Sequence, residues 1–381
     1  MIEITNKAKC SGCHACQSVC PKNCISMKSN AEGFLYPIVN KELCINCNLC
    51  KKICPILNKA EVQNEHVAYA AYNKDENVRM QSSSGGIFTL LAESVINRGG
   101  VVFGACFDKE FNVIHNFVSD INGLSKFRGS KYVQSKIGDT YIKAKEFLDK
   151  NRLVLFTGTP CQIGGLKSYL QKDYDNLICQ DIICHGVPSP LVWQKYVEFQ
   201  ENNVRATASS ICFREKAEGW RQYSVSILFK NGTQYKKYHQ EDLLMKAFLS
   251  DVCLRPSCYD CSFKTLNRQS DITLADFWGI ENVVPEMDDN KGTSLIITNN
   301  GKGEALLKNI NDQIAIKQVG LDCVNKYNHS YRDSAKLTNK RKGFMTNIKL
   351  KSFDCLVKKY CTITFIDRVI NKVKRVIGGI T

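Results

Sequence analysis

The chain has 381 residues, 44% of them hydrophobic and 23% charged, which is enough for two or three globular domains. It has no run close to about eighteen apolar residues, so we expect no transmembrane helix. Its net charge is +15, mostly from the C-terminal end, and its twenty cysteines far exceed what a core needs. Cysteine used as metal-binding thiolate is typical of a reducing compartment. Because Cys10 leaves no room for a signal peptide, we expect a cytoplasmic protein.

Two cysteine runs with the same spacing open the chain. Each reads C-x2-C-x2-C-x3-C-P, from Cys10 to Pro21 and from Cys44 to Pro55. In two-cluster ferredoxins, three closely spaced thiolates hold one iron–sulfur cube and the fourth reaches the other cube. Zinc is the alternative, but it usually takes its ligands as separated pairs. We therefore predict a two-cluster domain over residues 1–60, with one 4Fe-4S cluster on Cys10, Cys13, Cys16 and Cys54 and the other on Cys44, Cys47, Cys50 and Cys20.

A polar linker at residues 55–66 leads to a second predicted domain over residues 66–325. Its pattern alternates between strand and helix, which predicts an α/β fold with a mixed sheet behind a small α+β ferredoxin-like domain. We expect strands at 67–73, 101–107, 113–118, 153–156, 177–183, 272–275 and 294–298, antiparallel strands within 209–238, and helices at 86–97, 139–150, 161–170, 190–200 and 241–251.

A third set of cysteines follows from the strand–helix–strand unit at 153–183. Such a unit favours parallel strands, whose carboxyl ends meet at one edge of the sheet. Cys161 and Cys184 follow these two strands, and the C-x2-C pair of Cys258 and Cys261 lies in a later loop. We predict that these four cysteines hold a third 4Fe-4S cluster. The alternatives are that they are small buried residues, or that Cys253 replaces one of them.

Residues 81–87 place serines and glycines directly before the predicted helix at 86–97. Free N–H groups at a helix start can hold a phosphate, although a plain helix cap is the alternative. The chain has no G-x-G-x-x-G motif after a strand, so the usual dinucleotide fingerprint is absent from the sequence. His185 follows Cys184 and is a candidate catalytic proton donor, with a hydrogen-bonded structural histidine as the alternative.

Six stretches across residues 67–310 resemble the coenzyme F-420 hydrogenase/dehydrogenase beta-subunit family, which also resembles 7-hydroxymethyl chlorophyll a reductase. They are QSSSGGIFTLL, FRGSKYVQS, LFTGTPCQIGGL, DIICHGVPSP, RPSCYDCSFK and DITLADFWGI, in family order. The resemblance implies a non-covalent FAD beside a 4Fe-4S cluster. It further implies FAD-phosphate contacts from Ser83, Ser84, Gly85 and Gly86, and further flavin or substrate contacts from Arg128, Lys131, Gly158, Thr159 and Gln162.

These expectations predict an iron–sulfur flavoprotein oxidoreductase. Clusters move single electrons, whereas organic substrates usually exchange a hydride, so a flavin is needed between them. The partners would be a redox protein or ferredoxin and a deazaflavin coenzyme or another small organic substrate. The alternative is an electron-relay adaptor that feeds a partner enzyme and has no substrate site of its own.

The segment 335–381 is predicted to be a basic helical tail. Residues 336–381 carry twelve Lys or Arg and two Asp. Apolar residues recur at helical spacing from Ile366 to Ile380, which suits the inner face of a membrane or an acidic partner. A helix docked on its own domain is the alternative. Because the basic residues lack interleaved aromatics, we expect no nucleic-acid binding.

Overall fold

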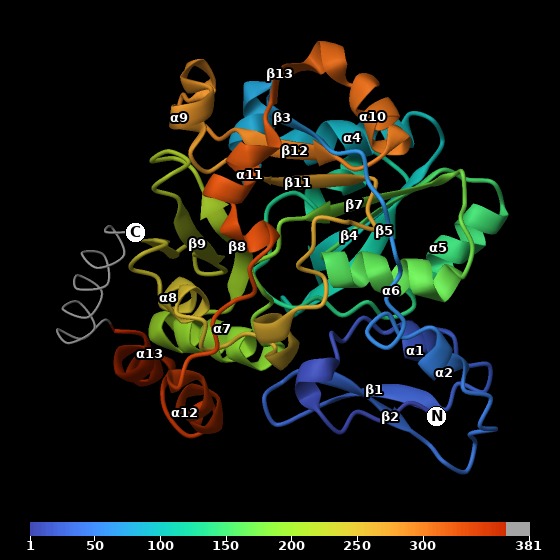
Figure 1. The fold of residues 1–381 in the computed structure, drawn as a ribbon. Helices are drawn as coiled ribbons and strands as arrows, with labels where there is room; N and C mark the ends of the chain where they lie inside the picture. The colour runs from blue at the N-terminus through green and yellow to red at the C-terminus, as the bar shows by residue number, and fades with distance from the viewer. Residues whose placement is uncertain (363–381) are drawn as a thin grey trace, which may run out of the picture.

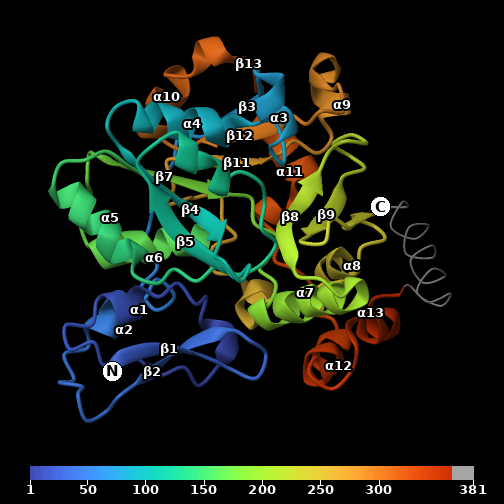
Figure 2. The ribbon, with the colours of Figure 1, turned by 180° about the vertical axis from the view of Figure 1, so that it is seen from behind.

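The computed structural model describes residues 1–362, and Figures 1 and 2 show it from opposite sides. Its centre is an eight-stranded mixed sheet in the order β13-β3-β12-β11-β7-β6-β4-β5. The predicted mixed α/β fold is thus confirmed. The strands are β3 (Val67–Asn73), β4 (Val101–Phe107), β5 (Val113–Val118), β6 (Val154–Thr157), β7 (Leu177–Ile182), β11 (Ile272–Asp276), β12 (Ser294–Thr298) and β13 (Ile314–Val319).

Four neighbouring strands of this sheet run parallel, namely β4, β6, β7 and β11, and the strands outside them pair antiparallel. The unit of β6, α6 (Pro160–Leu170) and β7 is therefore the predicted parallel strand–helix–strand unit. Its strands are buried along almost their whole length, as expected where helices cover both faces of a sheet.

Helices pack on both faces of the large sheet. On one face, α4 (Ile87–Ile96) and α10 (Gly301–Lys308) bury their apolar residues against β4, β6 and β12. On the other face, α5 (Thr140–Asp149) and α6 do so against β4, β6 and β7. Both layers place helix starts at the carboxyl edge of the parallel strands, which is where α/β proteins usually bind ligands.

The N-terminal cysteine runs form a small module below the large sheet, coloured blue in Figure 1. It contains α1 (Ala15–Ser18), the hairpin of β1 (Ile25–Ser29) and β2 (Leu35–Val39), and α2 (Leu49–Lys52). The helix α1 packs against α6, and the short helix η1 (Lys7–Lys9) packs against η3 (Pro256–Asp260). The module is therefore docked directly on the elements that carry the third set of cysteines.

A second antiparallel sheet, β10-β9-β8, lies beside the large one. Its strands are β8 (Ala208–Glu215), β9 (Ser224–Phe229) and β10 (Gln234–Tyr238), and they share a core with α7 (Pro190–Val204) and α8 (Leu243–Leu249). The later helices α12 (Lys340–Asn347) and α13 (Phe353–Cys361) pack into that core through Phe344 and Phe353.

The remaining short elements are the helices α3 (Glu76–Met80), α9 (Ile280–Val283) and α11 (Leu321–Tyr327), and the turns η2 (Asn122–Lys126), η4 (Pro285–Met287), η5 (Asn311–Gln313) and η6 (His329–Tyr331). Within residues 1–362, no helix is long and apolar enough to cross a membrane. The predicted amphipathic helix from Ile366 to Ile380 lies outside the described residues.

Candidate functional site

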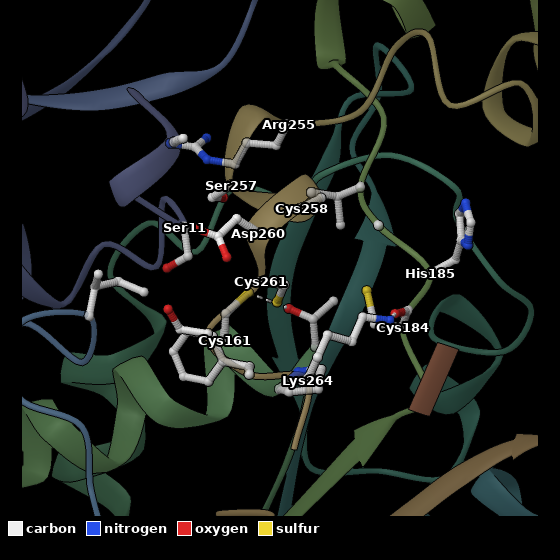
Figure 3. A pocket seen from close by; sticks show the side chains of 18 of the residues that line it. Ser11, Cys161, Cys184, His185, Arg255, Ser257, Cys258, Asp260, Cys261 and Lys264 are labelled. Carbon is white, nitrogen blue, oxygen red and sulfur yellow. Dashed lines mark hydrogen bonds between the residues drawn. The ribbon is translucent and has the colours of Figure 1, made fainter. Parts of the chain in front are cut away.

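Four cysteines from three parts of the chain gather around one void, which Figure 3 shows from close by. Cys161 lies in the first turn of α6, and Cys184 lies just beyond β7. Cys258 and Cys261 come from η3 and the residue after it. The structure thus brings together the four cysteines of the predicted third cluster. Cys253 is fully buried in the neighbouring core instead and does not line this void.

Burial raises the pKa of both Cys184 and Cys258 to about 12, and the neighbouring thiols add to the effect. As free groups these cysteines would therefore stay protonated, and only nearby cations could hold several thiolates together. Within residues 1–362, no three His, Cys, Asp or Glu side chains converge closely enough to hold a single metal ion. The four cysteines surround a void, and four thiolates around one space fit a cube of several iron atoms.

The eight cysteines of the N-terminal module surround two further voids. Cys54 lines the same void as the first three cysteines of the first run, and Cys20 lines the same void as the first three of the second run. The exchange of the fourth cysteine between the runs is the arrangement expected for a two-cluster ferredoxin. Cys24 also lines the second of these voids, with its sulfur 3.3 Å from that of Cys20.

The void around Cys10, Cys13, Cys16 and Cys54, called the inner void below, borders the void around Cys161. Ser11 and Ile56 line both of them. The hydroxyl of Ser11 is buried and has no hydrogen-bond partner among the described residues. An unpaired hydroxyl between two rings of cysteines fits a place where cluster sulfur would accept its hydrogen bond. The inner void and the void around Cys161 therefore lie next to each other across the boundary between the module and the large domain.

A larger cavity of about 610 Å³ adjoins the void around Cys161 on its other side. Thr159 and residues 184–187 line both spaces. The cavity is built from the segments that follow β6, β7 and β11 at the carboxyl edge of the sheet, together with the start of α4. Its size is within the usual range of cofactor pockets, about 300–1,000 Å³.

The start of α4 offers free backbone donors to this cavity. Gly86 precedes the helix in a left-handed conformation with φ +80°, and no side chain caps the helix. Gly86, Ile87 and Phe88 all line the cavity. An uncapped helix start of this kind is a ready binding place for a phosphate or pyrophosphate.

Eight of the nine residues implied as flavin contacts line this cavity: Ser83, Ser84, Gly86, Arg128, Lys131, Gly158, Thr159 and Gln162. Gly85 does not. Its N–H donates to Ser294 Oγ at 3.0 Å, and a Cβ at this position would stand 2.6 Å from the carbonyl oxygen of Ala71. Gly85 is therefore needed for close packing of the loop on the sheet, and it offers no surface to a ligand.

Two of the side chains implied as flavin contacts, Lys131 and Arg128, form hydrogen bonds within the protein. Lys131 is half-buried, and its ammonium donates to the carbonyl oxygens of Lys126, Arg128 and Gly129 at 2.9–3.2 Å. Burial lowers the pKa of Lys131 to about 8. Arg128 donates to Gln81 Oε1 at 2.6 Å. Both side chains therefore shape the loop at the cavity rim.

A hydrogen-bonded chain in the cavity wall includes a histidine that sequence reasoning did not single out. Gln162 Nε2 donates to Ser135 Oγ at 2.8 Å, and Ser135 Oγ lies 2.9 Å from His115 Nδ1. His115 Nε2 lies 3.0 Å from the carbonyl oxygen of Thr157, so it must donate there, and Nδ1 accepts from Ser135. Burial lowers the pKa of His115 to about 4, so the ring is neutral.

His185 lines both the void around Cys161 and the larger cavity. Its Nε2 lies 2.6 Å from Asp251 Oδ1, and its Nδ1 lies 3.3 Å from Ser330 Oγ. The carboxylate of Asp251 accepts from the ring and fixes its orientation. The geometry is compatible with a proton donor at the boundary of the two spaces.

Three further charged side chains at these spaces were not predicted from the sequence. Arg255 and Lys264 line the void around Cys161, and Lys264 donates to the carbonyl oxygen of Cys184. Arg214 lines the larger cavity, is paired with Asp276, and stacks 4.4 Å from the ring centre of Tyr223. The partners that position each of these side chains are distant in sequence, so no local sequence pattern predicts their place at the site.

Comparison with known proteins finds matches for both parts of the chain. Residues 151–322 match the model of a family described as the C terminus of the coenzyme F420 hydrogenase/dehydrogenase beta subunit, and residues 9–57 match that of a 4Fe-4S dicluster domain. No curated protein matches the chain. A chain of the F420-reducing NiFe hydrogenase complex from Methanosarcina barkeri is similar in fold, with a TM-score of 0.50 and 16% identity over 72% of this chain and 90% of that chain. The resemblance predicted from the sequence motifs is thus confirmed.

Proposed function

We propose that the protein is an iron–sulfur flavoprotein oxidoreductase. The support is that residues 151–322 match the family model of the C terminus of the coenzyme F420 hydrogenase/dehydrogenase beta subunit, and residues 9–57 match that of a 4Fe-4S dicluster domain. In this proposal the cysteines around the three voids hold three 4Fe-4S clusters, and the cavity of about 610 Å³ holds FAD. The substrate would be a deazaflavin coenzyme or another small organic molecule that exchanges a hydride.

The observation that carries the proposal is the shared wall between the void around Cys161 and the larger cavity. Thr159, Cys184 and His185 border both, and the uncapped start of α4 faces the cavity. A cluster and a flavin on either side of this wall would be close enough to exchange electrons. The residues shared by the inner void, the void around Cys161 and the cavity support a path from the module to the cavity.

FAD in this cavity would take up electrons singly from the cluster side and release them as a hydride to a substrate. The chain's own residues would do the rest. The first N–H groups of α4, with Ser83 and Ser84, would bind the pyrophosphate. Gln162, oriented by Ser135 and neutral His115, would hold the ring edge through its remaining Nε2–H.

Reduction of a flavin by single electrons also takes up protons, and His185 is placed to deliver one. Its Nε2 is paired with Asp251, while Nδ1 faces Ser330 Oγ at the cavity. In this role Asp251 would accept from Nε2 and hold the ring with Nδ1 toward the cavity. An adaptor without a substrate site would need neither this pair nor the cavity.

The direct test is chemical analysis of protein purified and reconstituted without oxygen. We expect about twelve iron atoms, four for each of three cubes, and one FAD per chain. About eight iron atoms with one FAD would remove the third cluster. About twelve iron atoms without any flavin after incubation with FAD would favour the adaptor.

A further inference from the structure

Arg255 is buried at the junction between the N-terminal module and the large domain, and its side chain is 1% exposed (Figure 3). Its Nε donates to the carbonyl oxygen of Cys10 at 2.8 Å, and its Nη2 donates to that of Leu35 at 2.9 Å. Its Nη1 donates to Gln134 Oε1 at 2.8 Å. These bonds fix the plane of the guanidinium against the module.

The same guanidinium touches the sulfur of a cluster cysteine. Nη2 lies within hydrogen-bond range of Cys10 Sγ, at 3.7 Å. Gly12 makes this approach possible, because a Cβ there would stand 2.7 Å from Nη1 of Arg255. The ring of Tyr36 covers one side of the guanidinium, with its centre 4.3 Å from the central carbon. The charge is therefore shielded from water and lies beside Cys10, which lines the inner void.

This positive charge is not balanced locally. Arg255 keeps a fixed charge under all ordinary conditions. The partners given above are two carbonyl oxygens, an amide oxygen and a cysteine sulfur, and within residues 1–362 no carboxylate forms an ion pair with it. Arg255 also lines the void around Cys161, so it lies between two predicted clusters.

We propose that Arg255 is a positioning residue that raises the reduction potential of the cluster held at the inner void. Reduction adds one electron and no proton to a cube, so the reduced cluster is more negative. A hydrogen bond to a ligand sulfur and a buried positive charge both stabilise that state. The inner cluster would then hold an electron more readily than its outer neighbour, which draws electrons toward the large domain. The inference rests on the iron–sulfur part of the proposed function and not on the flavin.

The test is a redox titration of the anaerobic holoprotein, followed by electron paramagnetic resonance of the clusters. The inner cluster is identified as the signal that changes in Cys13→Ser. In Arg255→Gln we expect its midpoint potential to fall, that of the cluster near Cys161 to fall less, and that of the outermost cluster to stay. Arg255→Lys keeps the charge but loses the fork of donors, so its shift should be smaller and in the same direction.

Arg341→Gln is the matched control. Arg341 also joins the two parts of the molecule, because it binds Glu32 of the module with two hydrogen bonds, at 2.9 and 2.7 Å. Its other bonds go to the carbonyl oxygen of Leu254, so, unlike Arg255, it donates to no cysteine of the inner void among the described residues. This variant should leave all cluster potentials unchanged. An equal shift in Arg341→Gln and Arg255→Gln would show that looser docking is the cause, and would overturn the proposal.

A second variant leaves Arg255 in place. Gln134→Glu puts a carboxylate beside the guanidinium and offsets its charge, so the potential of the inner cluster should fall again. If Arg255→Gln loses iron, the midpoint potentials of Gln134→Glu and Arg255→Lys test the proposal in its place. Unchanged potentials in both would contradict the proposal. So would loss of the inner cluster from all three variants, since Arg255 would then be required to bind the cluster and not to tune it.

Discussion

Gly165 of α6 lies directly against Cys13 of the N-terminal module. A Cβ built on Gly165 would stand 2.7 Å from the Cβ of Cys13 and 3.1 Å from its sulfur. The same helix carries Cys161 in its first turn. One helix therefore touches a predicted ligand of the inner cluster and supplies a predicted ligand of the third cluster, which keeps the distance between the two sites short.

Gly165→Val should separate the module from α6. The added side chain has no room beside Cys13, and on its other side the hydroxyl of Tyr141 would be 2.8 Å from its Cβ. We expect electron transfer between the module and the large domain to slow by at least about tenfold, with iron and flavin contents retained. Rapid-mixing kinetics would measure it. Gly301→Ala is the control, because a Cβ there meets nothing within 4 Å, and an equal effect from it would contradict this view of docking.

The cysteine sets were predictable because each depends on short spacing or on one supersecondary unit. Four cysteines of a run lie close together in any fold, and Cys161 and Cys184 follow adjacent parallel strands. Arg255 and Cys10 are 245 positions apart, and their contact exists only because the module docks on η3. No local pattern contains that information, which is why Arg255 was missed.

Ser83→Glu should weaken FAD binding far more than Ser83→Gln. Ser83 lines the cavity near the start of α4, and its hydroxyl accepts from the N–H of Ser130 at 2.8 Å. A carboxylate there would repel a pyrophosphate by on the order of 1–4 kcal/mol, which corresponds to about fivefold or more in affinity. The measurement is the dissociation constant of FAD for both variants. Equal constants would mean that the phosphates do not lie at Ser83.

Acid should destabilise the folded protein through His115. Burial lowers the pKa of this histidine from 6.5 to about 4, so the unfolded chain takes up the proton first as the pH falls. The stability that neutral His115 contributes is fully present above pH 6.5 and decreases toward pH 4, by up to about 1.4 kcal/mol per pH unit. His14 has the same direction of shift and adds to the slope.

His115→Gln should therefore flatten the dependence of the unfolding temperature on pH between 6.5 and 4. Its stability at neutral pH should be lower, because the bonds to Ser135 and Thr157 are disturbed. His329→Gln replaces an exposed histidine and serves as the control. If the slope of His115→Gln equals that of the control, His115 does not titrate on unfolding.

Truncation after Thr362 should leave iron, flavin and reductase activity near normal. The cut falls just behind α13, whose Phe353 and Leu356 belong to the core, and it removes four Lys or Arg with one Asp. Binding to anionic vesicles should weaken, since each basic residue near such a surface contributes about 1 kcal/mol. A cosedimentation assay at low and high salt measures this. Loss of FAD on truncation would instead assign the segment to the core.

Strand and helix patterns gave most of the large sheet, with bounds within a few residues for β3, β4 and β5. The pattern missed β13, whose residues Ile314–Val319 include Lys317 and Gln318. β13 is an edge strand that pairs with β3 alone. No further strand lies on its outer side, so its residues need not form a continuous apolar run. The sequence pattern also did not predict that α12 and α13 pack with α7 and α8, because the burial of short helices depends on partners that are distant in sequence.

The most direct test of the central claim is the rate at which the clusters of the module reduce bound FAD. Reduced ferredoxin, in less than stoichiometric amount, would be mixed with the holoprotein and with Cys161→Ser, and the flavin absorbance followed. In Cys161→Ser we expect the clusters of the module to be reduced at the normal rate and the flavin to be reduced at least about tenfold more slowly. Cys212→Ser, which changes an exposed cysteine on β8, should behave like the original protein. Unchanged flavin reduction in Cys161→Ser would contradict the path through the third cluster.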